Sequence, residues 1–171
     1  MPAEPRGDDA QRFARQLALP EIGPAGQARL RQARACIVGL GGLGSPAAFY
    51  LAAAGVGTID LVDGDRVDCS NLQRQILYGS ADLDRPKVEA AAERLRALDP
   101  GVALRLWPER LTPDNADDIL AEADVVIDAT DSPAAKFLIA DCCHARGRPY
   151  VHGGIAAFTG QLMTVLPGRT A

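Results

Sequence analysis

A glycine-rich turn between an apolar run and a helical segment constrains the fold of this chain more than any other feature. Residues 35–38 have the length and β-branched content of a buried strand. They lead into Gly39-Leu-Gly-Gly-Leu-Gly44, and a helix is expected over about residues 46–54 with Ser45 as its N-cap. A strand, a glycine turn and a helix in this order direct free backbone N–H groups and the positive end of a helix dipole at one place. Such a place suits a phosphate.

The glycine spacing matches the G-x-G-x-x-G fingerprint of dinucleotide binding at Gly39, Gly41 and Gly44. The next predicted strand, residues 58–62, ends at Asp63, which lies 22 residues after Gly41 and is placed to accept hydrogen bonds from ribose hydroxyls. In the alternative interpretation the glycines only let a helix pack close to a strand, and Asp63 caps a turn. We favour nucleotide binding, because the strand, glycines, helix and acid occur in order, but the motif does not say which nucleotide.

Strands alternate with helices along the rest of the chain, which predicts a Rossmann-like, doubly wound α/β fold. Its sheet should be mainly parallel, with helices on both faces. The expected strands are residues 35–38, 58–62, 102–107, 123–128, 149–152 and 161–166. The expected helices are residues 11–19, 24–33, 46–54, 86–98, a segment from 112 or 114 to 121, and 133–146.

Composition indicates one globular domain over residues 11–171, after a disordered N-terminus at residues 1–10. A net charge of −4 argues against nucleic-acid binding, because phosphate-backbone binders need a basic face. No apolar run approaches the length of a membrane span, so we expect no membrane attachment. The four cysteines form no C-x-x-C pair, and a reducing, cytoplasmic location is expected.

Polar side chains from three further segments are expected at the rim where the strands end. Asn71 and Arg74 belong to a long loop, residues 67–85, Lys87 opens the next helix, and Asp131 follows a buried strand. Two cations, a glycine cradle and spare carboxylates suit a triphosphate with Mg²⁺ better than a nicotinamide dinucleotide. Each residue also has an ordinary alternative as a surface cation, a first-turn helix residue or a helix cap. For Lys87 that alternative is unfavourable unless an anion lies nearby, because a cation at a helix N-terminus opposes the dipole.

The motifs as a whole resemble the MoeB/ThiF/HesA family, which is related to the adenylation domains of ubiquitin-activating enzymes. The amino-acid sequences of these motifs are slightly more similar to those of ThiF than to those of MoeB. The matching segments run in unbroken order from residue 12 to about residue 166. They are Arg12-Phe-Ala-Arg15-Gln16, Gly39-Leu-Gly-Gly-Leu-Gly44, Ala54-Gly-Val-Gly57, Leu61-Val-Asp63-Gly-Asp65, Ser70-Asn-Leu-Gln-Arg-Gln75, Arg85-Pro-Lys87, Asp128-Ala-Thr-Asp131 and Gly160-Gln161.

The resemblance implies an adenylyltransferase that uses MgATP to adenylate the C-terminal glycine of a ubiquitin-like sulfur-carrier protein, as in thiamine or molybdenum cofactor pathways. By family role, the glycine loop with Gly42 approaches the phosphates, and Asp63 holds the ribose. The resemblance gives three residues catalytic roles and two further residues nucleotide contacts. The catalytic residues are Arg74, Lys87 and Asp131, with Asp131 as the Mg²⁺ ligand, while Asn71 contacts the phosphates and Arg15 reaches the nucleotide of the partner subunit in a homodimer.

The sequence departs from the family pattern in two places. Ser132, Lys136 and Ala140 stand where members commonly carry Asn, Arg and Asn. The chain also ends at Ala171, before the expected cysteine pairs and carrier-binding segment, so we expect a domain truncated at its C-terminal end. We therefore expect no zinc site, weak or absent carrier adenylation, and an exposed apolar surface near residues 161–166 that favours self-association.

Two alternative functions remain open at this stage. One is a nucleotide- or carrier-binding module without turnover, and the other is an NAD(P)-dependent oxidoreductase supported only by the glycine motif and Asp63. Adenylation needs no general base, and neither His144 nor His152 has an evident acidic or cysteine partner in the sequence. Asp63→Ala is expected to weaken ATP binding by about one to two decades with little change in melting temperature.

Overall fold

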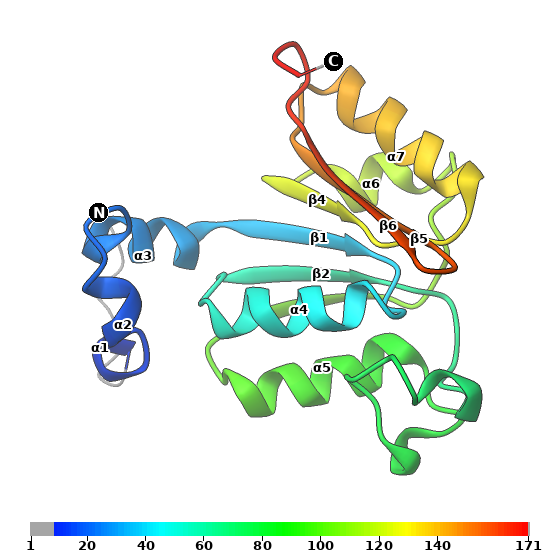
Figure 1. The fold of residues 1–171 in the computed structure, drawn as a ribbon, viewed down its shortest axis with the longest axis horizontal. Helices are drawn as coiled ribbons and strands as arrows, with labels where there is room; N and C mark the ends of the chain where they lie inside the picture. The colour runs from blue at the N-terminus through cyan, green and yellow to red at the C-terminus, as the bar shows by residue number, and fades with distance from the viewer. Residues whose placement is uncertain (1–8, 171) are drawn as a thin grey trace.

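The computed structural model describes residues 9–170, which form a six-stranded sheet in the order β3-β2-β1-β4-β5-β6 (Figure 1). The first five strands are parallel, and β6 returns antiparallel to β5. The strands are β1 (Arg34–Val38), β2 (Thr58–Val62), β3 (Ala103–Trp107), β4 (Val125–Asp128), β5 (Tyr150–Ala156) and β6 (Thr159–Val165). The doubly wound, Rossmann-like fold expected from the sequence is therefore confirmed.

Helices cover both faces of the sheet. In Figure 1, α4 and α5 lie on one face, and α6 and α7 lie on the other. The helices of the main body are α3 (Gly23–Gln32), α4 (Gly44–Ala53), α5 (Lys87–Leu98), α6 (Ala116–Leu120) and α7 (Pro133–Ala145). The central strand β1 divides its side chains between two cores, as the two-residue period of a strand requires. Ile37 packs with α4 and α5, whereas Cys36 and Val38 pack with α6 and α7.

The chain direction reverses across the sheet between β1 and β4. From β1 the chain first moves outward through β2 and β3, and it then returns to place β4 on the other side of β1. The loops after β1 and β4 therefore separate and leave a crevice at the carboxyl ends of the strands. In open α/β sheets this reversal point is where ligands bind.

The N-terminal segment differs from the single expected helix over residues 11–19. Two short helices, α1 (Asp9–Arg12) and α2 (Ala14–Leu17), are separated at Phe13. The Phe13 ring is 1% exposed and packs under the guanidinium of Arg31, so its burial sets the direction of the segment. The expected disorder at residues 1–10 is wrong for Asp9 and Ala10, which belong to α1, and the rest of that prediction lies outside the described residues.

The start of α4 also differs from the sequence prediction, because Ser45 is not its N-cap. The helix begins one residue earlier, at Gly44, after Leu43, and no side chain caps it. Ser45 is fully buried inside the first turn, where its hydroxyl donates to the carbonyl of Leu40. The hydroxyl therefore stabilises the glycine loop, and the N–H groups of the loop are left uncapped by this side chain.

The long connection between β2 and α5 is held together by backbone hydrogen bonds within the connection. Arg66 forms an isolated bridge with Pro86, and the loop contains two short 3₁₀ turns, η1 (Cys69–Asn71) and η2 (Ser80–Asp82). The hydroxyl of Tyr78 donates to the carbonyl of Leu40, and burial raises the pKa of this phenol. The loop is thus fastened to the glycine turn and forms one wall of the crevice.

The hairpin of β5 and β6 presents apolar side chains to solvent, as expected near residues 161–166. Leu162 is 80% exposed and Met163 48%, and Ile155 and Phe158 are exposed beside them. The four cysteines, all within the described residues, are free. None of the helices between residues 9 and 170 combines the length and the hydropathy that crossing a membrane requires.

Gly44→Ala tests how tightly α4 is packed against β1. A Cβ at this position would lie 1.9 Å from the carbonyl oxygen of Gly39, a contact that only backbone movement can relieve. We expect the free energy of unfolding to fall by about 3 kcal/mol, measured by urea denaturation. Gly79→Ala is the control, because its Cβ meets nothing nearer than 4.0 Å and its cost should stay below about 0.5 kcal/mol. Equal effects in the two variants would contradict the packing argument.

Candidate active site

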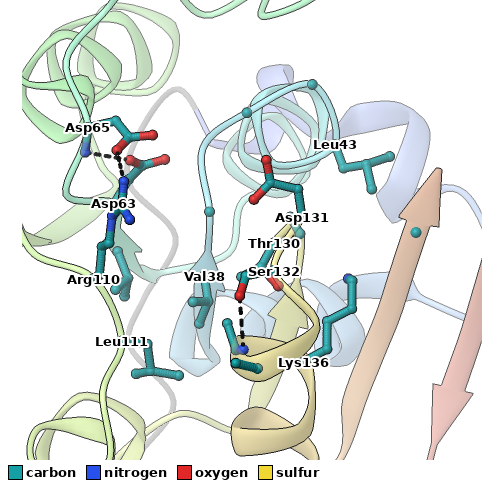
Figure 2. Close-up of a pocket in the computed structure, with 18 of the residues that line it drawn as sticks. Val38, Leu43, Asp63, Asp65, Arg110, Leu111, Thr130, Asp131, Ser132 and Lys136 are labelled. Carbon is teal, nitrogen blue, oxygen red and sulfur yellow. Dashed lines mark hydrogen bonds and ion pairs between the residues drawn. The ribbon is translucent and has the colours of Figure 1, made fainter. Parts of the chain in front are cut away.

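A cavity of about 1110 Å³ opens at the carboxyl ends of the strands, where the chain direction reverses. Figure 2 shows its two sides, with Asp63, Asp65 and Arg110 across from Thr130, Asp131 and Lys136. The glycine loop lies between them. The first side comes from the ends of β2 and β3, and the second from the ends of β4, α7 and the β5–β6 hairpin. The cavity thus brings together segments from most of the chain.

The four glycines of the loop divide into two structural roles. Gly41 and Gly42 line the cavity, and within residues 9–170 their backbone N–H groups donate to no protein acceptor. Gly39 has φ +90°, and a Cβ there would lie 2.8 Å from the carbonyl oxygen of Ala129. Gly44 lies outside the cavity lining and allows the close contact between α4 and Gly39. Free N–H groups at the start of a helix form an anion-binding surface, so the loop fits a phosphate.

Asp63 connects three parts of the site. One carboxylate oxygen accepts the N–H of Leu40 at 2.8 Å, and the other accepts the N–H of Asp65 at 2.8 Å. The ammonium of Lys87 lies 3.9 Å away. Each carboxylate oxygen keeps a second acceptor position, so Asp63 can still receive a hydroxyl hydrogen bond. The residue therefore holds the glycine loop as well as offering an acceptor to a ligand.

Lys87 is buried at the start of α5, where its positive charge opposes the helix dipole. The carboxylates of Asp63 and Asp65 offset that charge. The Lys87 side chain is 7% exposed, and Nζ donates to Asp65 at 3.3 Å. Arg110, from the loop after β3, contacts the other Asp65 oxygen at 3.0 Å. Burial alone would raise the pKa of Asp65, but the hydrogen bonds from Arg110 and Lys87 outweigh it and hold the pKa below its ordinary value. The sequence did not identify Arg110, since only the fold places it beside Asp65.

Arg74 and Asn71 come from the same loop, but the structure places only Arg74 in the cavity lining. The Arg74 side chain lies against the glycine loop, because a Cβ on Gly42 would be 3.4 Å from its Cδ. The Asn71 side chain caps η1 together with Asp68. Arg15 is exposed on α2, at the end of β1 opposite the glycine loop (Figure 1). Arg15 therefore lies far from the cavity of its own chain.

Asp131 projects from the loop after β4 and lines the cavity opposite Asp63 and Asp65 (Figure 2). It forms no ion pair with any described residue, so its carboxylate is available to a cation. The described part of the chain contains no group of three or more metal-ligating side chains. One carboxylate is nevertheless sufficient for Mg²⁺ that arrives with phosphate oxygens and water, and Asp131 fits that role.

A second charged cluster lies on the floor of the cavity, around Asp128 at the end of β4. Asp128 is 2% exposed, and its carboxylate accepts hydrogen bonds from the backbone N–H and the hydroxyl of Thr130. It also accepts from Lys136 Nζ, which lies 3.2 Å from each oxygen, and from His152 Nδ1 at 2.9 Å. Lys136 also donates to the carbonyl of Gly153 at 2.6 Å, which ties α7 to β5. The expectation that His152 has no acidic partner is therefore wrong, because parallel pairing of β4 and β5 aligns His152 with Asp128.

Apolar side chains complete the wall beyond Asp63. Val38 and Leu111 lie there together (Figure 2), and three residues of α7 also line the cavity. The three are Ala134, Ala135 and Leu138. An apolar wall beside a carboxylate that keeps free acceptor positions is suited to a flat aromatic group.

The fold and this cavity define the class of the chain, a Rossmann-like domain with a cavity at the switch point of its sheet, which is where sheets of this class bind nucleotides. Its family follows from comparison: the ThiF family model matches residues 13–171, and the chain belongs to that family. The resemblance found in the sequence motifs is thereby confirmed at the level of the family.

The relatives are longer than this chain. A probable adenylyltransferase/sulfurtransferase of Mycobacterium tuberculosis, MoeZ, is 46% identical over 154 residues, which are 90% of this chain and 39% of the relative. The sulfur carrier protein adenylyltransferase of Thermus thermophilus is 45% identical over 155 residues, 91% of this chain and 57% of the relative. The chain therefore spans between about two fifths and three fifths of these two proteins.

Solved structures agree with the fold. The tRNA N6-threonylcarbamoyladenosine dehydratase of E. coli, TcdA, superposes with a TM-score of 0.83 at 32% identity, covering 91% of this chain and 66% of that one. The same enzyme in complex with ATP also superposes with a TM-score of 0.83, at 31% identity, covering 91% of this chain and 65% of that one.

The contacts of Asp63 change the expected outcome of Asp63→Ala. Because the carboxylate accepts two backbone N–H groups, its removal should lower the free energy of unfolding by about 2 kcal/mol, in addition to weakening ATP binding by about one to two decades. Differential scanning calorimetry and isothermal titration measure the two effects. Asp63→Asn retains one acceptor and should recover part of the stability. An unchanged melting temperature in Asp63→Ala would show that these backbone contacts contribute nothing.

Proposed function

We propose that this domain binds MgATP and adenylates the C-terminal glycine carboxylate of a ubiquitin-like sulfur-carrier protein. The observation that supports it most is the convergence of the glycine loop, Asp63, Arg74 and Lys87 on one cavity. The names of the relatives support the reaction class, since those two proteins are an adenylyltransferase/sulfurtransferase and a sulfur carrier protein adenylyltransferase.

The nucleotide is proposed to lie across the first side of the cavity. The base would face the apolar wall, Asp63 would accept the ribose hydroxyls, and the phosphates would follow the glycine loop toward Arg74 and Lys87. Two cations and two free N–H groups suit a triphosphate, which carries more negative charge than the two phosphates of a nicotinamide dinucleotide. Asn71, on the same loop as Arg74, would reach the phosphates only if its η1 cap opened.

Catalysis in this proposal is electrostatic. Charge develops on the α-phosphate oxygens when the carboxylate attacks, and fixed cations stabilise that charge. Arg74 and Lys87 would act directly on the phosphates, while Asp131 would hold the Mg²⁺ that arrives with ATP. A carboxylate is already a competent nucleophile, so this first step requires no general base.

Assembly and location are part of the proposal. Arg15 lies at the end of the molecule opposite its own cavity, so it would serve the cavity of a partner subunit in a homodimer. The free cysteines support a reducing, cytoplasmic location. The thiamine and molybdenum cofactor pathways are both compatible with the relatives, and we propose a pathway of this sulfur-carrier type.

Nucleotide preference tests the first half of the proposal. Isothermal titration of the chain with MgATP and with NAD should give tighter binding of MgATP, because the cations contact a triphosphate. Arg29→Ala, an exposed arginine on α3 outside the cavity lining, should leave both affinities unchanged. Tighter binding of NAD would overturn the proposal in favour of an oxidoreductase.

Carrier-dependent ATP–pyrophosphate exchange tests the second half, with a sulfur-carrier protein that ends in Gly-Gly as the substrate. Arg74→Ala and Asp131→Ala should each depress exchange by about 10²-fold while changing ATP affinity by less than about tenfold, because both act mainly on the transition state. Asp114→Asn, at an exposed position outside the cavity lining, is the matched control. Exchange at the unmodified rate in both cavity variants would remove these residues from the mechanism.

A further inference from the structure

The cluster around Asp128 has no role in nucleotide binding or in the adenylation step proposed above. It lies on the second side of the cavity, the side from which Asp131 also projects. Three side chains form it, from three different elements: Asp128 at the end of β4, Lys136 on α7 and His152 on β5. The Asp128 side chain is buried and the His152 side chain is 21% exposed, and the parallel pairing of β4 with β5 holds the two residues side by side.

The contacts fix which nitrogen of His152 carries its proton. An ionised carboxylate can only accept hydrogen bonds, so Nδ1 must be the donor in its 2.9 Å contact with Asp128. In the neutral ring Nε2 then holds the lone pair. Nε2 has no hydrogen-bond partner within residues 9–170, and it lies beside Gly154, where an added Cβ would be 3.6 Å from it. His152 and Gly154 both line the cavity.

The neighbouring charges keep this arrangement balanced. Lys136 offsets the charge of Asp128, and its third hydrogen bond, to the Gly153 carbonyl, leaves its ammonium no proton for a ligand. Asp131 is the other charged group on this side of the cavity. Burial, and to a smaller extent the charge of Asp128, raises the pKa of Cys143 on α7 and of Tyr150 on β5. Strand β6 carries no ionisable side chain.

We propose that His152 is the general base for the nucleophile that consumes the acyl-adenylate, which is a thiol. The inference rests on the proposed function, in which adenylation leaves an activated carbonyl beside the second side of the cavity. Relatives named adenylyltransferase and sulfurtransferase join these two activities in one protein, which favours sulfur as the attacking atom. An Asp–His pair with a free Nε2 is the arrangement by which proteins remove a proton from a hydroxyl or thiol.

The step balances without an oxidant or a metal. Nε2 accepts the thiol proton while sulfur attacks the acyl carbonyl, forming a carbon–sulfur bond. The carbon–oxygen bond to the phosphate breaks, and AMP leaves with the electron pair. The products are a thioester, AMP and an imidazolium, which returns its proton to solvent. Lys136 and Asp128 are positioning residues, because they act through the imidazole.

The test separates the two half-reactions of the full chain. His152→Gln, with His144→Gln as the control at an exposed position on α7, is assayed with MgATP and a Gly-Gly-terminated sulfur carrier. Pyrophosphate exchange should change by less than about twofold in both variants. AMP release with glutathione as the thiol should fall by about 10²-fold in His152→Gln at pH 7, the usual contribution of a general base. It should remain unchanged in His144→Gln.

The pH profile distinguishes a base from a structural role. Above the thiol pKa of about 8.5, glutathione is mostly thiolate and needs no base, so the deficit of His152→Gln should largely disappear at pH 9. A deficit that is equal at pH 7 and pH 9, or no deficit at all, would overturn the inference. So would ¹⁵N chemical shifts of the free protein that place the His152 proton on Nε2. Weak exchange in the unmodified chain would agree with the sequence analysis, whereas binding of MgATP with no exchange at all would instead reject the proposed adenylation.

Discussion

The contact between the start of α4 and the carbonyl of Gly39 is the constraint on which the site depends. It allows α4 to begin directly behind β1, so the loop between them is held in one conformation with its N–H groups facing outward. Ser45, Tyr78 and Asp63 then fasten that loop from three directions, through the Leu40 carbonyl and N–H. A larger residue at Gly44 would separate strand from helix, and the loop, the long β2–α5 connection and Asp63 would all shift together.

Two carboxyl groups, the exposed Asp65 and the buried Asp128, organise the charged side chains on either side of the glycine loop. Asp65 joins Lys87 to Arg110, and Asp128 joins Lys136 to His152. In both clusters the partners come from different elements, 22 and 45 residues from Asp65 in the first cluster and 8 and 24 residues from Asp128 in the second. The two clusters are therefore formed only when the sheet is complete, which couples the geometry of the site to the order of the strands.

The sequence was sufficient for features whose cause is local. The strand–glycine–helix order predicted a site at the carboxyl ends of the strands with Asp63 beside it, and the structure has a cavity there that Asp63 lines. The anion that the position of Lys87 requires is supplied by Asp63 and Asp65 of the protein itself. The sequence failed where the cause lies in distant segments. Ser45 lies inside the first turn of α4, where its hydroxyl donates a hydrogen bond to the Leu40 carbonyl and does not cap the helix. His152 finds its acid only because β4 and β5 pair in parallel register, and that register cannot be derived from the composition of either strand.

The pairing of Lys87, Arg110 and Lys136 with carboxylates limits what the cavity can attract. Each of these cations already has an anionic neighbour, so the cavity presents little net positive potential to approaching solutes. Among the described residues, Arg74 is a lining cation with no carboxylate partner, so the attraction of a polyanion by charge is concentrated at that side chain. Selection then depends on shape, that is, on whether a ligand can fill the apolar wall and reach Asp63 while its phosphates meet the free N–H groups. The site is built to discriminate among anions by their geometry, and the abundance of free phosphate in a cell should hardly affect it.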